Sequence, residues 1–211
     1  MLFCGNDYLG LRLHPAVLGA AHDALALGAG AGSSRLVSGN LEPHERAERA
    51  LADYVGHDAA LLGSSGFAVN IGTLPALTGP GDVIFSDALN HASIVDACRL
   101  SRARTIVFPH LDHVALAAAL PAARPFRRGW IVTESVFSMD GDLAPLAAYA
   151  TLAAAAGLHL YVDEAHSLGV IGPDGRGLCA ATAVRPDVLV GTLGKALGCA
   201  GAFVAGREVL R

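Results

Sequence analysis

The sequence has little charge, and its positive charge is almost all of one kind. A single lysine, Lys195, stands against fourteen arginines in 211 residues, and charged residues make up 16% of the chain. The formal net charge of −4 at pH 7 gives no basic surface for nucleic acid or for an anionic membrane. Apolar residues reach 53%, which argues against disorder because the chain has enough apolar surface to form a core.

Long apolar runs and paired cysteines are also missing. No run approaches the roughly 18 apolar residues of a membrane-spanning helix, and the first residues lack the basic region of a secretory leader. The four cysteines (Cys4, Cys98, Cys179 and Cys199) are far apart and form no C-x-x-C pair. They predict reduced thiols in a cytoplasmic protein, not a disulfide framework.

The apolar pattern predicts an α/β fold with a largely parallel sheet flanked by helices. Helical periodicity covers 43–55, and an alanine-rich helix is expected from Leu143 to Ala156, closed by Gly157. Nearly continuous apolar strands are expected where helices cover both faces of a sheet. The length allows one domain, 1–211. The expected strands are 59–63, 82–86, 104–108, 129–134, 158–163, 187–191 and 201–205.

Polar residues gather where three of the expected strands end. Glu134 and Ser138 follow one strand, Asp163 and His166 follow the next, and Lys195 follows a third. In open α/β sheets, ligands bind beyond the carboxyl ends of the strands. Singly, Asp163 could cap a turn, Ser138 could begin one, and His166 could bond a backbone carbonyl. Together they predict one crevice that holds a carboxylate, an imidazole and the only lysine.

Two glycine- or histidine-containing segments add candidate contacts. Gly63-Ser64-Ser65-Gly66-Phe67 lies between a strand and a helix expected near Ala68, where backbone N–H groups could bind an anion. A plain glycine turn would have the same sequence. Asn90-His91-Ala92-Ser93 opens another helix, where His91 could stack on a planar ligand or only occupy the helix start.

Several familiar motifs are excluded by spacing. The residues at 163–166 spell a helicase box, but the chain contains no phosphate loop of the form G-x-x-x-x-G-K-[ST]. The G-x-S-x-G element of α/β hydrolases is absent as well. His110 and His113 flank Asp112 without the further ligands of a zinc site, so both are expected to be solvated and no metal is predicted.

Aldehyde chemistry accounts for the combination that remains. Arginine stays protonated, whereas a lysine amine can lose its proton and attack a carbonyl carbon. Pyridoxal 5'-phosphate (PLP) needs such a lysine, a carboxylate for its pyridine nitrogen, and donors for its phosphate. Lys195, Asp163 and the Ser65-Gly66-Phe67 turn with Thr192 fill these roles. Taken alone, Lys195 could equally be a lysine that an arginine-rich sequence retains by chance on a loop.

Seven segments resemble the α-oxoamine synthases, which are PLP enzymes of the aspartate-aminotransferase fold. The resemblance covers nearly the whole chain, and the segments occur in the order found in that family. They are NDYLGL (6–11), GSSRLVSG (32–39), SGFAVN (65–70), NHASIVDA (90–97), TESVFSMDGDLAPL (133–146), DEAHSLGVIG (163–172) and GTLGKALG (191–198).

This resemblance implies a role for each candidate residue. Lys195 carries PLP and transfers a proton, Asp163 pairs with the pyridine nitrogen, and His91 stacks on the ring. His166 and Ser138 bond the phenolic-oxygen side of the ring. Lys195, His91, Asp163 and His166 are therefore the expected catalytic residues. The other implied contacts are Gly66, Phe67 and Thr192 to the phosphate, and Asn6, His91 and Glu134 to the substrate.

The resemblance also implies an acyltransferase that joins a small amino acid to an acyl thioester with loss of CO2, working as a homodimer. The run 133–146 most resembles the branch that uses L-alanine and a pimeloyl thioester; the other branches share most motifs and stay open. The family pattern includes an N-terminal arm and a C-terminal small domain with a carboxylate-binding arginine, which this sequence lacks. A non-catalytic PLP-binding remnant is therefore a second alternative. The loop 28–39 could lie across a partner's cofactor pocket.

Overall fold

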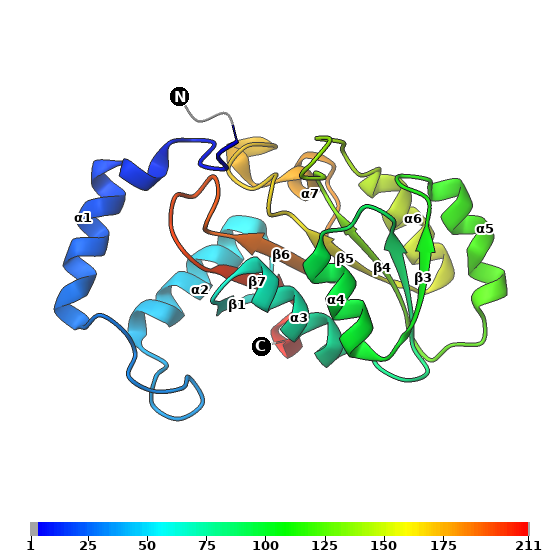
Figure 1. Cartoon of the computed structure of the whole chain (residues 1–211), viewed down its shortest axis with the longest axis horizontal. Coiled ribbons are helices and arrows are strands. Elements are labelled where there is room, and N and C mark those ends of the chain that lie inside the picture. Colours follow the sequence, from blue (N-terminus) through cyan, green and yellow to red (C-terminus); the bar gives the residue numbers. More distant parts are fainter. Residues whose placement is uncertain (1–3, 211) are drawn as a thin grey trace.

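In a computed structural model, which describes residues 4–210, seven strands form one sheet and helices cover both of its faces (Figure 1). The strands are β1 (Ala59–Gly63), β2 (Val83–Asp87), β3 (Arg104–Phe108), β4 (Gly129–Glu134), β5 (His159–Asp163), β6 (Val188–Thr192) and β7 (Ala202–Gly206). The helices are α1 (Pro15–Ala24), α2 (Glu42–Val55), α3 (Gly66–Leu77), α4 (Ala92–Ser101), α5 (His113–Ala123), α6 (Leu146–Ala156) and α7 (Leu178–Ala181). Short 3-10 turns occupy Leu11–Leu13, Leu25–Leu27, Pro173–Gly175 and Glu208–Leu210.

The sheet is largely parallel, as the sequence predicts. Its strand order is β1-β7-β6-β5-β4-β2-β3. The neighbours from β6 to β3 pair in parallel, whereas β7 pairs antiparallel with both β6 and β1. The carboxyl ends of β4, β5 and β6 therefore lie side by side at one edge of the sheet, where a ligand is expected.

Each central strand supplies residues to two hydrophobic clusters, because successive side chains point to opposite faces. In β5, Tyr161 packs in the cluster that contains residues of α3 and α4. Its neighbour Val162 packs in the cluster that contains residues of α2, α5 and α6. This double burial explains why the strands are apolar at nearly every position.

Two helix starts differ from those expected. α6 begins at Leu146, three residues after the expected start at Leu143, because Pro145 is its N-cap and disfavours helical geometry in the residue before it. The expected end is confirmed: Gly157 closes α6 with a φ of 68°. α3 begins at Gly66, two residues before the expected start, because the Ser65 side chain caps it there.

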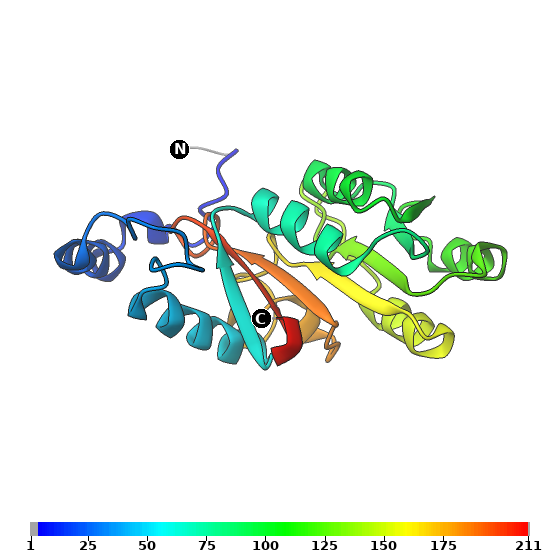
Figure 2. The ribbon, with the colours of Figure 1, turned by 90° about the horizontal axis from the view of Figure 1, so that it is seen from below.

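The segment that contains α1 lies apart from the sheet (Figure 2). No residue of α1 is buried. Large apolar side chains of this segment are exposed, namely Leu18, Leu25, Leu27, Leu36 and Val37. Among residues 4–210, no helix is long and apolar enough to cross a membrane.

Candidate functional site

A cavity of about 150 Å³ lies beyond the carboxyl ends of β4, β5 and β6. An engineered protein cavity of about this volume holds benzene, so there is room for one six-membered ring. Residues from three strand ends and from the starts of α3 and α4 line it: Gly66, Phe67, Asn70, His91, Ser93, Glu134, Asp163, Ala165, His166, Thr192 and Lys195.

Lys195 follows β6 and is half-buried in the wall of this cavity. Its Nζ atom lies 2.6 Å from Nε2 of His166. Burial lowers the pKa of Lys195, while the nearby carboxyl groups of Asp163 and Glu134 act in the opposite direction. Because the pKa of Lys195 is lowered overall, a larger fraction of the side chain is the neutral amine at a given pH, and this is the form that attacks a carbonyl.

His166 lies between Lys195 and Tyr8. Its Nδ1 atom is 2.7 Å from the Tyr8 hydroxyl, and the Tyr8 ring lies tilted by 52° at a centroid distance of 6.2 Å. Burial, and then electrostatic interactions with Lys195 and His91, lower the pKa of His166 to about 4. The imidazole is therefore neutral near pH 7 and offers one donor and one acceptor.

Asp163 ends β5 and is 6% exposed. Its Oδ2 atom accepts a hydrogen bond from the Asn70 side chain at 2.8 Å, and its Oδ1 atom accepts one from the backbone N–H of Ala165 at 2.9 Å. Burial raises the pKa of Asp163, and these donors oppose the rise. A protonated ring nitrogen beside this carboxyl would compensate for its burial.

Asn70 is a lining residue that our sequence analysis did not select. Its Nδ2 atom also donates to Ser93 at 2.9 Å, and its Oδ1 atom accepts from the Tyr161 hydroxyl at 2.7 Å. A signal was available, because Asn70 lies four residues after Gly66 and therefore on the same face of α3. Helical periodicity counted from the predicted anion-binding turn would have identified it.

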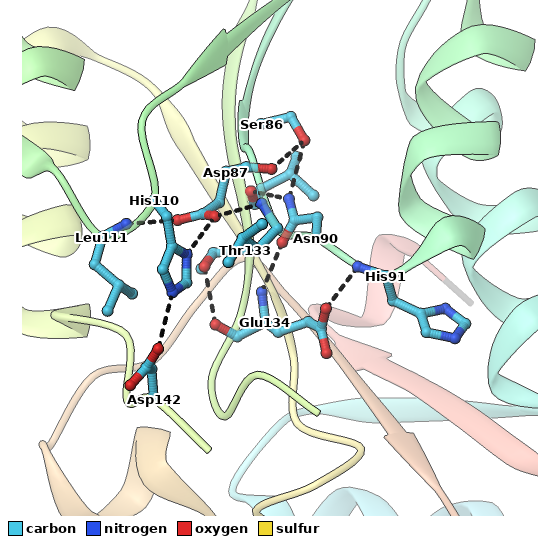
Figure 3. A network of polar contacts seen from close by, with 11 residues as sticks. Ser86, Asp87, Asn90, His91, His110, Leu111, Thr133, Glu134 and Asp142 are labelled. Atoms are coloured by element: carbon cyan, nitrogen blue, oxygen red, sulfur yellow. Dashed lines mark hydrogen bonds and ion pairs between the residues drawn. The ribbon is translucent and has the colours of Figure 1, made fainter. Parts of the chain in front are cut away.

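Glu134 belongs to a polar network at the ends of β2 and β4 (Figure 3). Its Oε1 atom accepts from the His91 backbone N–H at 2.6 Å, and its own N–H donates to Asn90 at 3.0 Å. The Asn90 amide in turn donates to the backbone oxygen of Val132 at 2.8 Å. Burial, and then the neighbouring Asp163, raise the pKa of Glu134 to about 7. This network fixes the start of α4 against β4.

The same network continues to His110, which was expected to be solvated (Figure 3). That expectation is wrong: the His110 side chain is 20% exposed and packs edge-on against Phe137 at 4.4 Å. Its Nδ1 atom lies 2.8 Å from Asp87, and its Nε2 atom lies 3.3 Å from Asp142. Burial lowers the pKa of His110, but the hydrogen bonds and charges of Asp87 and Asp142 outweigh it, so the pKa is raised.

The start of α3 presents the predicted anion-binding turn to the cavity. Ser65 caps this helix through a hydrogen bond from the Ala68 N–H at 3.1 Å, and Gly66 and Phe67 line the cavity. Thr192 also lines the cavity, and its hydroxyl donates to the backbone oxygen of Gly201 at 3.2 Å. Free N–H groups at a helix N-terminus favour an anion such as a phosphate.

Ser138 and Asn6 lie outside the lining of the cavity, whereas His91 is part of it. Ser138 is exposed and is not among the lining residues. His91 lines the cavity, and its Nδ1 atom is held 2.8 Å from the Ser93 hydroxyl. Asn6 is exposed and connects to the site through Tyr8, whose hydroxyl donates to it at 3.2 Å. In the part of the chain that the structure describes, no group of three His, Cys, Asp or Glu side chains could hold a metal ion.

Fold and site together define a class: an α/β sheet whose strand ends hold a lysine and a buried carboxylate around a ring-sized cavity. The whole chain, residues 1–211, matches the family model of aminotransferase class I and II, and the chain belongs to this family.

Curated relatives indicate a narrower group. Over 98% of its length, the chain is 54% identical to the 8-amino-7-oxononanoate synthase of an Anaeromyxobacter species and 55% identical to that of Mycolicibacterium smegmatis. These matches cover 53% and 55% of the two relatives, so the chain spans about half their length. The relationship expected from the seven sequence segments is confirmed.

Solved structures confirm the predicted fold class. A serine palmitoyltransferase from S. paucimobilis with a bound PLP–myriocin aldimine superposes with a TM-score of 0.92 at 35% identity, covering 96% of this chain and 52% of that one. An 8-amino-7-oxononanoate synthase from Francisella tularensis superposes with a TM-score of 0.83 at 29% identity, covering 99% of this chain and 58% of that one.

Proposed function

We propose that this chain is the cofactor-binding part of a PLP-dependent acyltransferase. It condenses L-alanine with a pimeloyl thioester, on coenzyme A or a carrier protein, with loss of CO2 to give 8-amino-7-oxononanoate. The observation that carries the proposal is the only lysine amine of the chain, which lies in the wall of a ring-sized cavity that it shares with buried Asp163. Relatives more than 50% identical that carry this enzyme's name support the choice of substrates.

The residues around the cavity fit PLP. Lys195 supplies the amine for covalent attachment, and Asp163 stabilises a protonated pyridine nitrogen. The N–H groups at Gly66 and Phe67, together with Thr192, line the cavity and would bind the phosphate. When bound, PLP supplies an electron sink for the carbanion at the amino-acid Cα.

The remaining predicted roles concern the ring and the substrate. His91 stacks on the ring face, and His166 bonds its phenolic-oxygen side. Glu134 lines the cavity and can contact an amino-acid substrate directly. Asn6 would contact the substrate beside Tyr8, to whose hydroxyl it is hydrogen-bonded. The predicted contact of Ser138 requires a shift of its exposed turn.

We further propose that the protein works as a cytoplasmic homodimer, with residues 1–211 as its PLP-binding large domain. Support comes from the exposed apolar side chains of α1 and of the residues that follow it, among them Leu18, Leu27 and Leu36, because a second subunit could cover them. In the loop 28–39, Arg35 bonds Asn40 at 2.6 Å and pairs with Glu48.

A borohydride experiment tests the cofactor assignment. The protein is incubated with PLP and reduced, and the labelled peptide is identified by mass spectrometry. Because Lys195 is the only lysine, one labelled side chain is expected, and Lys195→Arg should abolish it. Absence of label at Lys195, or equal trapping by the arginine variant, contradicts the assignment.

Product analysis on a full-length version separates the branches of the family. The expected product forms from L-alanine and a pimeloyl thioester, and a biotin-requiring strain should be rescued. Turnover of glycine with acetyl-CoA, but not of alanine, would favour another branch. PLP binding by the 211-residue chain without turnover beside an active full-length version would favour the alternative in which this chain alone only binds the cofactor.

A further inference from the structure

Four side chains form a continuous line from the cavity to the surface. The Lys195 Nζ atom is 2.6 Å from Nε2 of His166, and Nδ1 of His166 is 2.7 Å from the Tyr8 hydroxyl. The Tyr8 hydroxyl donates to Oδ1 of Asn6 at 3.2 Å. Tyr8 is 44% exposed, so its hydroxyl is within reach of solvent, whereas Lys195 is half-buried. Neither the sequence motifs nor the cavity lining gives Tyr8 a role.

When Lys195 is charged, the numbers of donors and acceptors determine which atom donates in each hydrogen bond of this line. An ammonium group has three donors and no acceptor, so Nε2 of His166 must accept from it. A neutral imidazole then carries its proton on Nδ1 and donates to the Tyr8 oxygen. The Tyr8 hydrogen is left for Asn6 or for water, which agrees with the bond from Tyr8 to Asn6. Burial keeps His166 neutral by lowering its pKa to about 4.

The opposite direction satisfies both hydrogen bonds of His166 when Lys195 is neutral. The amine then has a lone pair, which can accept from Nε2–H of His166. Nδ1 becomes the acceptor, and the Tyr8 hydroxyl donates to it. The contacts of His166 with Lys195 and with Tyr8 persist in both states, and only the hydrogen positions differ. The hydrogen bond from Tyr8 to Asn6 is made only when Lys195 is charged, because the phenol has a single hydrogen.

We propose that His166 and Tyr8 form a proton relay between the Lys195 amine and solvent. In one transfer, Lys195 Nζ gives a proton to Nε2 of His166, Nδ1 gives its proton to the Tyr8 oxygen, and the Tyr8 hydroxyl proton leaves to water. Lys195 ends as a neutral amine, His166 ends in its other tautomer, and Tyr8 ends unchanged. Burial raises the pKa of Tyr8, so the phenol remains protonated and able to pass a proton on.

Only the use of the relay depends on the proposed function: an amine must lose a proton before it can attack the aldehyde of the cofactor. The hydrogen-bond line itself belongs to the ligand-free chain. The other ionisable groups that face it are His91 beside His166, and Asp163 and Glu134 beside Lys195. Failure of PLP to bind would therefore leave the relay testable.

The test follows two nuclei through one pH titration of the ligand-free protein. ¹⁵N-histidine labelling reports the tautomer of His166, assigned with His166→Gln, and ¹³C-lysine labelling gives a single side-chain signal because the chain has one lysine. We expect His166 to change from Nδ1–H to Nε2–H with the same midpoint as the Lys195 titration. In Tyr8→Phe the fraction of His166 that changes tautomer through the Lys195 titration should fall by about threefold or more, as expected for a lost hydrogen bond.

A matched control is Tyr54→Phe, which removes a hydroxyl that donates to the Gly175 backbone oxygen at 2.7 Å outside the cavity. It should titrate like the unaltered chain. The proposal is overturned if His166 keeps one tautomer through the Lys195 titration. It is also overturned if Tyr8→Phe leaves the size of the tautomer change intact, or if Tyr54→Phe reduces it equally.

Discussion

The Asn70 side-chain amide lies 2.8 Å from Oδ2 of Asp163, while the Asn70 carbonyl accepts a hydrogen bond from the Tyr161 hydroxyl at 2.7 Å. All three side chains are buried. Tyr161 therefore determines which end of the Asn70 amide faces Asp163, and the amide holds the Asp163 carboxyl group in one orientation. The hydrogen bond from Asn70 also opposes the rise in the pKa of Asp163 that burial causes.

Replacing Asn70 should weaken both the fold and the cavity. Asn70→Ala leaves the buried Tyr161 hydroxyl without this acceptor, which costs about 1–3 kcal/mol in free energy of unfolding. It also removes one donor from Asp163, so the carboxyl is protonated more readily and pairs less well with a pyridine nitrogen. We expect PLP affinity to fall about tenfold, measured by absorbance titration beside urea unfolding.

Tyr161→Phe serves as the control because the Asn70–Asp163 bond can persist in it. It should lose stability but retain more PLP affinity than Asn70→Ala. Equal PLP affinity in Asn70→Ala and the unaltered chain would show that Asn70 does not position Asp163 for the cofactor.

The strands and the three polar strand ends could be predicted because apolar runs and the polar residues that directly follow them are local signals. Asp163 and Lys195 were found in this way. Helical periodicity could also have selected Asn70, but its bond to Tyr161 could not have been predicted, because it joins residues 91 positions apart and depends on how α3 packs on β5. His110 was misjudged for the same reason: its carboxylate partners, Asp87 and Asp142, come from distant parts of the chain.

Two substitutions at Ser65 separate helix capping from anion binding. Ser65→Ala removes the cap of α3 and should cost about 1 kcal/mol in free energy of unfolding. Ser65→Asp retains a capping side chain and should preserve stability, but its charge would repel a phosphate at the helix start. We expect PLP affinity to fall more than tenfold in Ser65→Asp, measured by equilibrium titration.

Asp112 offers a matched cap outside the cavity. It accepts from the N–H groups of Val114 and Ala115 at the start of α5. Asp112→Ala should lower stability by a similar amount without changing PLP affinity. If Ser65→Asp binds PLP normally, the start of α3 is not the phosphate site.

Glu134 should make stability depend on pH. Its folded-state pKa of about 7 lies above the ordinary value of 4.5, so between these pH values the folded chain binds more protons than the unfolded chain. The stabilisation is complete below pH 4.5 and is lost as the pH rises through 7. Glu134→Gln should remove this loss and gain about 3 kcal/mol at pH 8 relative to the unaltered chain.

Urea unfolding from pH 5 to pH 8 measures the slope directly. Glu42→Gln, at an exposed glutamate of α2, is the control and should leave the slope unchanged. A Glu134→Gln variant with the same pH dependence as the unaltered chain would show that this carboxyl is already ionised in the folded state at low pH.

His110 should be a cation in the folded protein, because each of its ring nitrogens faces a carboxylate oxygen that can only accept. Its raised pKa means that its contribution to stability is complete below its ordinary value of 6.5 and is lost as the pH rises through the folded-state pKa. NMR titration of the His110 ring should therefore give a midpoint above 6.5. Asp142→Asn removes one of the two charges and should lower that midpoint, whereas Asp140→Asn, at an exposed neighbour in the same turn, should not. A midpoint below 6.5 in the unaltered chain would mean that His110 is neutral and bonds only one of its two carboxylates.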